Sequence, residues 1–129
     1  MSIYFKISIA ILSLMITTSN PVMAQAPVKI EPPKVLSVKE TIYKYAEIYN
    51  VSAERMYKTA FCESSLNPNA INSTEREYSV GIAQINLKAH SHITVTQAKN
   101  VEFASEFMAK EFAKGNARIW TCYVKIYGV

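Results

Sequence analysis

The two cysteines of this chain, Cys62 and Cys122, constrain its fold more than any other feature of the sequence. In an oxidising compartment an even pair of cysteines predicts a disulfide. The bond would close a loop of 59 intervening residues, which stabilises the folded state by about 4 kcal/mol in the chain-entropy model. Two separately buried thiols are the alternative, and the choice depends on whether the protein is exported.

The first 24 residues have the pattern of a secretory signal peptide. Lys6 precedes an apolar run over residues 7–16, and the small residues Val22 and Ala24 stand where a cleavage site requires them. The run is too short to cross a bilayer, which takes about 20 residues; an uncleaved anchor is the alternative. Because no cysteine adjoins the cleavage point, a lipoprotein is not expected. We predict an exported protein, periplasmic or extracellular, without a stable membrane anchor.

The remaining chain is long enough for one domain with one core. Residues 25–36 contain three prolines and read as an extended lead, so that the folded domain occupies residues 37–129. Ser37 and Glu40 form a capping-box pattern that begins the first helix. Further helices are predicted from the Ser52 cap to residues 63–65 and over residues 100–115 and 116–127, whereas residues 66–96 keep no helical period. The predicted fold class is mostly α, a compact helical domain with a short irregular or β segment in the middle.

Helical spacing also predicts which side chains face the core. An aromatic stripe at this spacing is usually core, so we assign Trp120 to it and leave open whether Tyr78 and Tyr123 stack on sugar rings instead. The inward-facing set is Val38, Ile42, Tyr45 and Tyr49; Met56, Ala60 and Cys62; Phe103, Phe107, Met108 and Phe112; and Trp120, Tyr123, Val124 and Tyr127.

Glu63 stands at the predicted end of the second helix, directly after Cys62 and before an Asn-Pro break. A helix C-terminus disfavours an anion by a few tenths of a kcal/mol or more. A carboxylate in that place, beside a covalently pinned backbone, is a candidate for a pre-organised catalytic group. The alternative is a solvated charge at a helix end.

Three motifs then follow in order: Glu63-Ser64, Asn-Pro-Asn-Ala at residues 67–70, and Gly-Ile-Ala-Gln-Ile at residues 81–85. Together they resemble the soluble lytic transglycosylases, the goose-type-lysozyme-like group that cleaves peptidoglycan. The resemblance covers about residues 41–123 and implies a lysozyme-like fold with peptidoglycan strands as substrate.

The resemblance implies that Glu63 acts first as general acid and then as general base. Ser64 is expected to form hydrogen bonds near it, and Gln84, with Ile82 and Ala83, to position the sugar beside the scissile bond. Ala83 replaces the methionine that the family usually has before this glutamine, which makes that wall of the subsite smaller.

The family's later Ala-Tyr-Asn motif is missing, and "WTCY" occupies that part of the chain. Tyr123 is therefore the candidate for the tyrosine that often faces the catalytic glutamate. The small size is similar to that of specialised members that open the wall for a secretion or conjugation apparatus.

The chemistry fits a chain in which every acidic residue is a glutamate. Most glycoside hydrolases use two carboxylates, and the nearby candidates for a second one are Glu75 and Glu77. A transglycosylase needs one, because the 6-hydroxyl of N-acetylmuramic acid attacks the anomeric carbon and forms a 1,6-anhydro ring. Hydrolysis by Glu75 or Glu77, and a non-catalytic wall-binding or assembly module, are the alternatives.

An acid that is protonated at neutral pH needs a raised pKa, which an apolar wall supplies. We expect Phe61, Ile82 and Ile85 to form that wall. Gly81 is expected to need a positive φ or to allow a close approach to a ligand.

Other classes of site receive little support. His90 and His92 have no third ligand at matching spacing, so we predict surface residues and neither a metal site nor a cofactor. The formal net charge of +4 falls to +3 without Lys6 and is scattered along the chain. Scattered charge argues against a nucleic-acid partner, and we expect a monomer.

Overall fold

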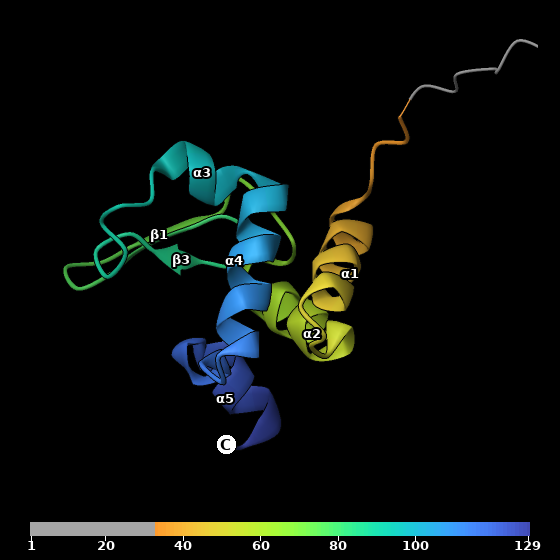
Figure 1. Ribbon diagram of the computed structural model, residues 1–129. Coiled ribbons are helices and arrows are strands. Elements are labelled where there is room, and N and C mark those ends of the chain that lie inside the picture. Colours follow the sequence, from red (N-terminus) through yellow and green to blue (C-terminus); the bar gives the residue numbers. More distant parts are fainter. Residues whose placement is uncertain (1–32) are drawn as a thin grey trace, which may run out of the picture. The chain divides into compact units, whose positions relative to one another are not determined.

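The computed structural model describes residues 33–129; the predicted signal peptide and most of the proline-containing lead lie outside them. The elements, drawn in Figure 1, confirm the predicted fold class of a mostly helical domain with a short β segment. No helix in the described part of the chain is long and apolar enough to cross a membrane. The helices are α1 (Val38–Ile48), α2 (Ala53–Ser64), α3 (Val95–Lys99), α4 (Val101–Ala113), the 3₁₀ helix η1 (Ala117–Ile119) and α5 (Thr121–Tyr127); the strands are β1 (Ile71–Ser73), β2 (Tyr78–Val80) and β3 (Ile85–Asn86).

Local capping explains where the longer helices begin. Ser37 and Glu40 form a complete capping box at α1, and Ser52 caps α2 through the N–H of Arg55. Asn100 caps α4 in the same way. These three starts confirm the predictions, because a cap satisfies otherwise unpaired N–H groups within one turn of chain.

Helix α4 contacts α1, α2 and α3, and in Figure 1 it stands between the sheet and α1. Helix α5 packs against α2. The disulfide between Cys62 and Cys122 joins the last turn of α2 to the first turn of α5, and so confirms the predicted pairing.

The three strands form an antiparallel sheet in the order β1-β2-β3. Val80 pairs with Ile71 on one side and with Ile85 on the other. Gly81 ends β2 with φ +80°, and a Cβ placed there would lie 2.0 Å from the carbonyl oxygen of Ala98. The predicted need for glycine is confirmed, and the group that approaches it is main chain of α3.

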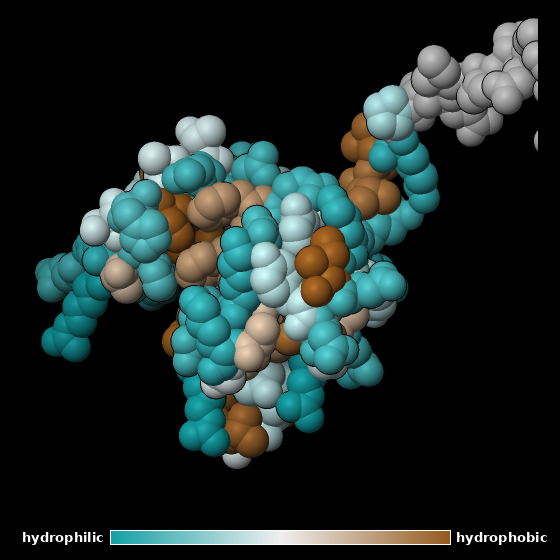
Figure 2. Space-filling view, in the orientation of Figure 1, coloured by the Kyte–Doolittle hydropathy of each residue, from teal (hydrophilic) through white to brown (hydrophobic). Residues whose placement is uncertain are grey.

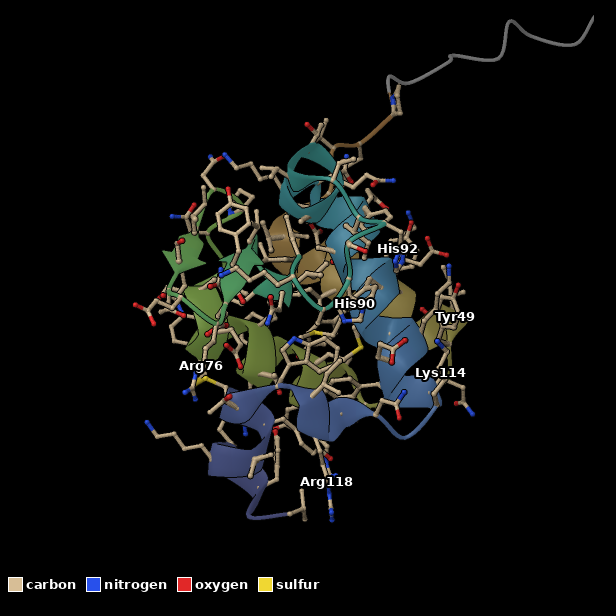
Figure 3. All side chains as sticks on the ribbon, turned by 90° about the vertical axis from the view of Figure 1, so that its left-hand side faces the viewer. Tyr49, Arg76, His90, His92, Lys114 and Arg118 are labelled. Atoms are coloured by element: carbon tan, nitrogen blue, oxygen red, sulfur yellow. A yellow bond between two sulfur atoms is a disulfide. The ribbon has the colours of Figure 1, made fainter. Side chains whose placement is uncertain are left out.

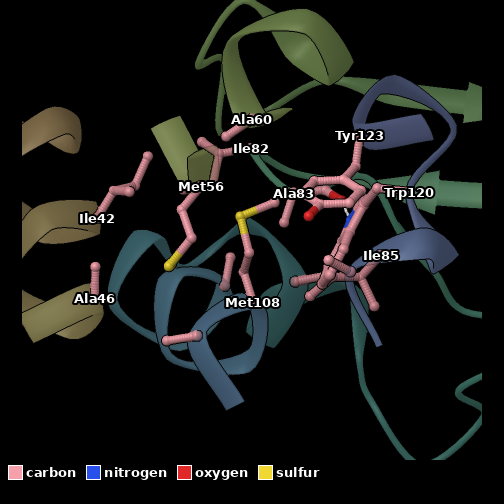
Figure 4. Close-up of a cluster of buried hydrophobic side chains, with 14 of the residues drawn as sticks. Ile42, Ala46, Met56, Ala60, Ile82, Ala83, Ile85, Met108, Trp120 and Tyr123 are labelled. Carbon is pink, nitrogen blue, oxygen red and sulfur yellow. Dashed lines mark hydrogen bonds between the residues drawn. The ribbon is translucent and has the colours of Figure 1, made fainter. Parts of the chain in front are cut away.

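The core joins the helices to the sheet (Figure 4). Met56 from α2 and Met108 from α4 are almost fully buried beside Ile42 and Ile82. Trp120 is 4% exposed, as predicted for a core residue, and its indole N–H donates a 2.7 Å hydrogen bond to the carbonyl oxygen of Ala83.

Two inward-facing assignments are wrong. Cys62 is exposed, because Met56, Thr59 and Ala60 occupy the buried face of α2 and Cys62 turns toward α5 at the surface. Val124 is 39% exposed, since only Tyr123 in the short helix α5 is buried.

Candidate active site

Glu63 lies in the last turn of α2, where the chain leaves the helix abruptly. Ser65 and Leu66 follow with φ of 52° and 62°, and the side chain of Asn67 accepts a hydrogen bond from the N–H of Asn69. Two left-handed residues before a proline end the helix at once. Glu63 therefore lies at the mouth of a turn, as the sequence predicted, and its side chain is half-buried.

The carboxylate of Glu63 is fixed by main chain from the far end of the domain. The N–H of Cys122 donates a 2.9 Å hydrogen bond to Glu63 Oε1. The disulfide between Cys62 and Cys122 holds the same two segments together. The carboxylate thus has a fixed position relative to both helices, which a solvated charge at a helix end would not have.

An open cleft of about 470 Å³ lies in front of Glu63. In Figure 2 the outline of the molecule is indented between the tip of the β1–β2 hairpin and α5. Figure 3 looks onto this side, with Arg76 at the left and His90 near the middle of the view. The cleft is lined by Glu63, Arg76, Glu77, Gln84, Ile85, Asn86, Ala89, His90, Phe107, Ile119, Trp120 and Thr121.

The surroundings of Glu63 raise its pKa. Loss of solvation by burial is the main cause, and the negative charge of Glu77 adds to it; the hydrogen bond from the Cys122 N–H acts in the opposite direction. Burial and a like charge both disfavour the ionised form. The balance favours a carboxyl group that keeps its proton to higher pH than an exposed glutamate, which suits a general acid.

Glu77 and Glu75 occupy different environments although only one residue separates them. Glu77 lines the cleft, and the buried hydroxyl of Ser79 donates a hydrogen bond to its Oε1. Glu75 is exposed at the hairpin tip and does not line the cleft. Lys88 Nζ holds that tip through the carbonyl oxygens of Thr74 and Glu75, at 2.9 and 2.7 Å.

Gln84 and Ser64 both bond to main chain. Gln84 lines the cleft with φ 45°, and its Nε2 donates a 3.0 Å hydrogen bond to the carbonyl oxygen of Gly81. The Ser64 hydroxyl donates a 2.8 Å hydrogen bond to the carbonyl oxygen of Ile82. Ser64 therefore ties α2 to the turn that carries Gln84, and no hydrogen bond joins it to Glu63 within the described residues.

Three residues predicted to contact substrate lie behind the cleft. Ile82 and Ala83 are 1% and 0% exposed, so neither presents a surface to a ligand. Tyr123 is 8% exposed, and its hydroxyl accepts a 3.0 Å hydrogen bond from Arg55 on the α2 face away from the cleft.

The predicted apolar wall is only partly correct. Ile85 lines the cleft, whereas Phe61 is 53% exposed on another face. Successive helical residues are rotated by about 100°, so Phe61 and Glu63 point to opposite sides of α2. Phe107 supplies apolar surface in its place, and the buried Trp120 backs it.

Several cleft residues had no role in the sequence interpretation. The sequence assigns Trp120 and Phe107 to the core; Trp120 belongs to it and Phe107 packs against it. His90 packs edge-to-face on Phe107 at a centroid distance of 5.1 Å. Neither Asn86 nor Arg76 belongs to a motif that the sequence made recognisable. No three potential metal-binding side chains come together within residues 33–129.

A family model described as the Transglycosylase SLT domain matches residues 40–125 of this chain. The matched segment is more than half of the chain and contains every residue that lines the cleft. Comparison with curated proteins and with solved structures finds no match.

Proposed function

The chain belongs to the transglycosylase SLT domain family, whose members act on peptidoglycan outside the cytoplasm, and on this premise we propose that it is an exported lytic transglycosylase. It cleaves the β-1,4 bond between N-acetylmuramic acid and N-acetylglucosamine, with formation of a 1,6-anhydro ring. Residues 1–24 are the signal peptide that is removed on export, residues 25–36 a lead, and residues 37–129 the catalytic domain, which acts as a monomer.

The observation that carries this proposal is the setting of Glu63. It is a half-buried carboxyl group with a raised pKa, held by the Cys122 N–H at 2.9 Å, in an open cleft. A protonated acid in a fixed position is the group that glycosidic bond cleavage requires.

The reaction needs no second carboxylate. Glu63 donates its proton to the glycosidic oxygen as the bond between that oxygen and the anomeric carbon breaks. The 6-hydroxyl oxygen of the same N-acetylmuramic acid then bonds to the anomeric carbon, and its proton passes to the Glu63 carboxylate. The acid is restored at the end of the cycle, and water does not enter the product.

Other cleft residues offer contacts for a sugar polymer. Phe107 presents apolar surface, which suits the face of a sugar ring, and the 4% exposed Trp120 packs behind it. Asn86 and Arg76 provide polar groups at the wall formed by the sheet. We infer that Phe107, Asn86 and Arg76 bind the glycan and that Gln84 shapes the main chain beside it.

A second candidate function is hydrolysis, favoured by the presence of Glu77 in the same cleft. As a base, Glu77 would activate a water molecule for attack on the anomeric carbon. Hydrolysis by Glu77 predicts a hydrated product and loss of turnover in Glu77→Gln. Glu75 has no part in this alternative, because its side chain lies outside the cleft.

The test compares Glu63→Gln with Glu54→Gln, a matched carboxyl-to-amide change on the exposed face of the same helix. We expect Glu63→Gln to bind sedimented peptidoglycan and release no soluble fragments, and Glu54→Gln to release them at the wild-type rate. Release by Glu63→Gln at the wild-type rate would contradict the assignment. Binding without turnover by the wild type would instead establish a non-catalytic module.

A further inference from the structure

An aromatic and aliphatic patch lies on the helices outside the cleft. Tyr43 of α1 packs edge-to-face on Tyr57 of α2, and Tyr57 stacks with Phe61, at centroid distances of 6.3 and 6.2 Å. Tyr43, Phe61 and Ile126 of α5 are 40%, 53% and 41% exposed. Large apolar side chains grouped on a surface, and not scattered singly, mark an interaction site.

Part of this patch is a groove between α2 and α5. It has a volume of about 590 Å³ and is lined by Tyr57, Lys58, Phe61, Cys62, Lys125 and Ile126. It shares no lining residue with the cleft of Glu63. A ligand in this groove would therefore leave the catalytic side of the domain open.

Lysine ammonium groups lie along the edge of the groove. Lys58 and Lys125 line it, and the ammonium group of Lys39 lies 5.3 Å from the centroid of the Tyr57 ring. Lys39 and Lys125 form no ion pair with any residue between 33 and 129, whereas Lys58 pairs with Glu54 at 2.6 Å. No carboxylate lines the groove.

We propose that this groove docks an acidic segment of another protein, with a large apolar side chain seated against Phe61 and Ile126. The apolar floor fits such a side chain, and the lysines at the edge complement its acidic neighbours. Because the lining places Tyr57 and Cys62 on α2 opposite Ile126 on α5, the docked segment contacts two helices that the disulfide already joins.

Other occupants fit the surface less well. A second copy of this chain would bring lysines against lysines. A glycan needs several hydrogen-bonding groups around an aromatic ring, and the lining offers only the tyrosine hydroxyl and two ammonium groups. A membrane surface favours apolar side chains that project into it, whereas these residues enclose a hollow.

The test uses two fluorescein-labelled amphipathic peptides with the same leucine and phenylalanine positions, one with glutamate and one with lysine at every polar position. Fluorescence anisotropy with the purified, disulfide-bonded protein should show the acidic peptide binding at least about tenfold more tightly, with an affinity that falls as salt rises. We expect Phe61→Ser to weaken this binding about tenfold. The control Ile48→Ser, at a 61% exposed position outside the groove, should not change it.

Charge reversal separates this surface from a merely hydrophobic one. Lys125→Glu should weaken binding of the acidic peptide and strengthen binding of the basic peptide. The proposal is overturned if the wild type binds both peptides with equal affinity or does not bind the acidic peptide. It is also overturned if Phe61→Ser and Ile48→Ser change the affinity for the acidic peptide equally. The proposal is likewise overturned if the protein binds phosphatidylglycerol vesicles but not the acidic peptide, and Phe61→Ser abolishes the vesicle binding.

Discussion

Replacement of Gly81 by alanine should destabilise the protein far more than the same replacement at Gly115. Both glycines have φ +80°, a conformation that costs an L-residue roughly 1–2 kcal/mol. At Gly115 a new Cβ would meet no atom within 4 Å. At Gly81 it would lie 2.0 Å from the carbonyl oxygen and 2.9 Å from the carbonyl carbon of Ala98, so main chain of α3 or of the turn must move.

A forced shift of packed structure adds about 1–3 kcal/mol. We therefore expect Gly81→Ala to lower the free energy of unfolding by about 2–5 kcal/mol and Gly115→Ala by about 1–2 kcal/mol. Urea denaturation of the oxidised proteins measures both, followed by the fluorescence of the single tryptophan, Trp120, which is 4% exposed. If both variants lose the same free energy of unfolding, the Ala98 carbonyl is not what requires glycine at position 81.

Three further changes test other parts of the account. Trp120→Phe leaves a buried main-chain carbonyl without its 2.7 Å donor, and we expect urea denaturation of this variant and the wild type, followed by circular dichroism, to show a loss of about 1–3 kcal/mol; an unchanged midpoint would count against that hydrogen bond. Cys122→Ser opens the disulfide and should lower the free energy of unfolding by about 4 kcal/mol, to the value of the wild type measured in reductant. Glu77→Gln removes a negative charge that raises the pKa of Glu63, so the alkaline fall of the rate of wall cleavage should move to lower pH, whereas Glu75→Gln should leave the pH profile unchanged.

The same pKa shift has a consequence for stability. Because the folded-state pKa of Glu63 is raised, the folded state binds a proton more tightly than the unfolded chain, and stability falls as pH rises from the unfolded pKa through the folded one. Above the unfolded pKa, the burial of this carboxyl group therefore lowers the free energy of unfolding. Glu63→Gln should be at least as stable as the wild type at pH 7 in urea denaturation, and a clear loss of stability would contradict the burial of this carboxyl group.

The sequence predicts best those features of the fold that depend on residues close together in the chain. The starts of α1, α2 and α4 depend on the side chains of Ser37, Ser52 and Asn100 within one turn of chain. Helix α3 was not predicted, although Thr94 and Gln97 form a capping box. Five residues are too few for an apolar period to be recognised.

The site shows where such reasoning fails. Glu63 was found because its helix end, the break after it and the motif all lie nearby in the chain. Phe61 was assigned to the wrong side because a separation of two residues rotates a helical side chain by about 200°. The sequence names Glu75 and Glu77 together, and only the fold of the hairpin places Glu77 in the cleft and Glu75 outside it. Trp120 reaches the cleft through the packing of α5, which no local pattern encodes.

The substrate-binding roles given to Ile82 and Tyr123 rest on the resemblance, and Ile82 is also predicted as part of the apolar wall. A motif aligns positions along the chain, whereas burial depends on the packing of the whole domain. Here Ile82 is covered by the core, and Tyr123 bonds to Arg55 behind the cleft.

The mass of the fragments released from peptidoglycan shows directly whether Glu63 cleaves the glycan without the addition of water. Purified protein and Glu63→Gln are incubated with cell-wall sacculi, and the soluble muropeptides are resolved by mass spectrometry. If Glu63 is the single acid and the substrate's own hydroxyl attacks, the wild type releases anhydro fragments, which are lighter than hydrated ones by one water molecule. Glu63→Gln then releases no fragments. Hydrated fragments from the wild type would contradict this mechanism and assign the reaction to water activated in the same cleft.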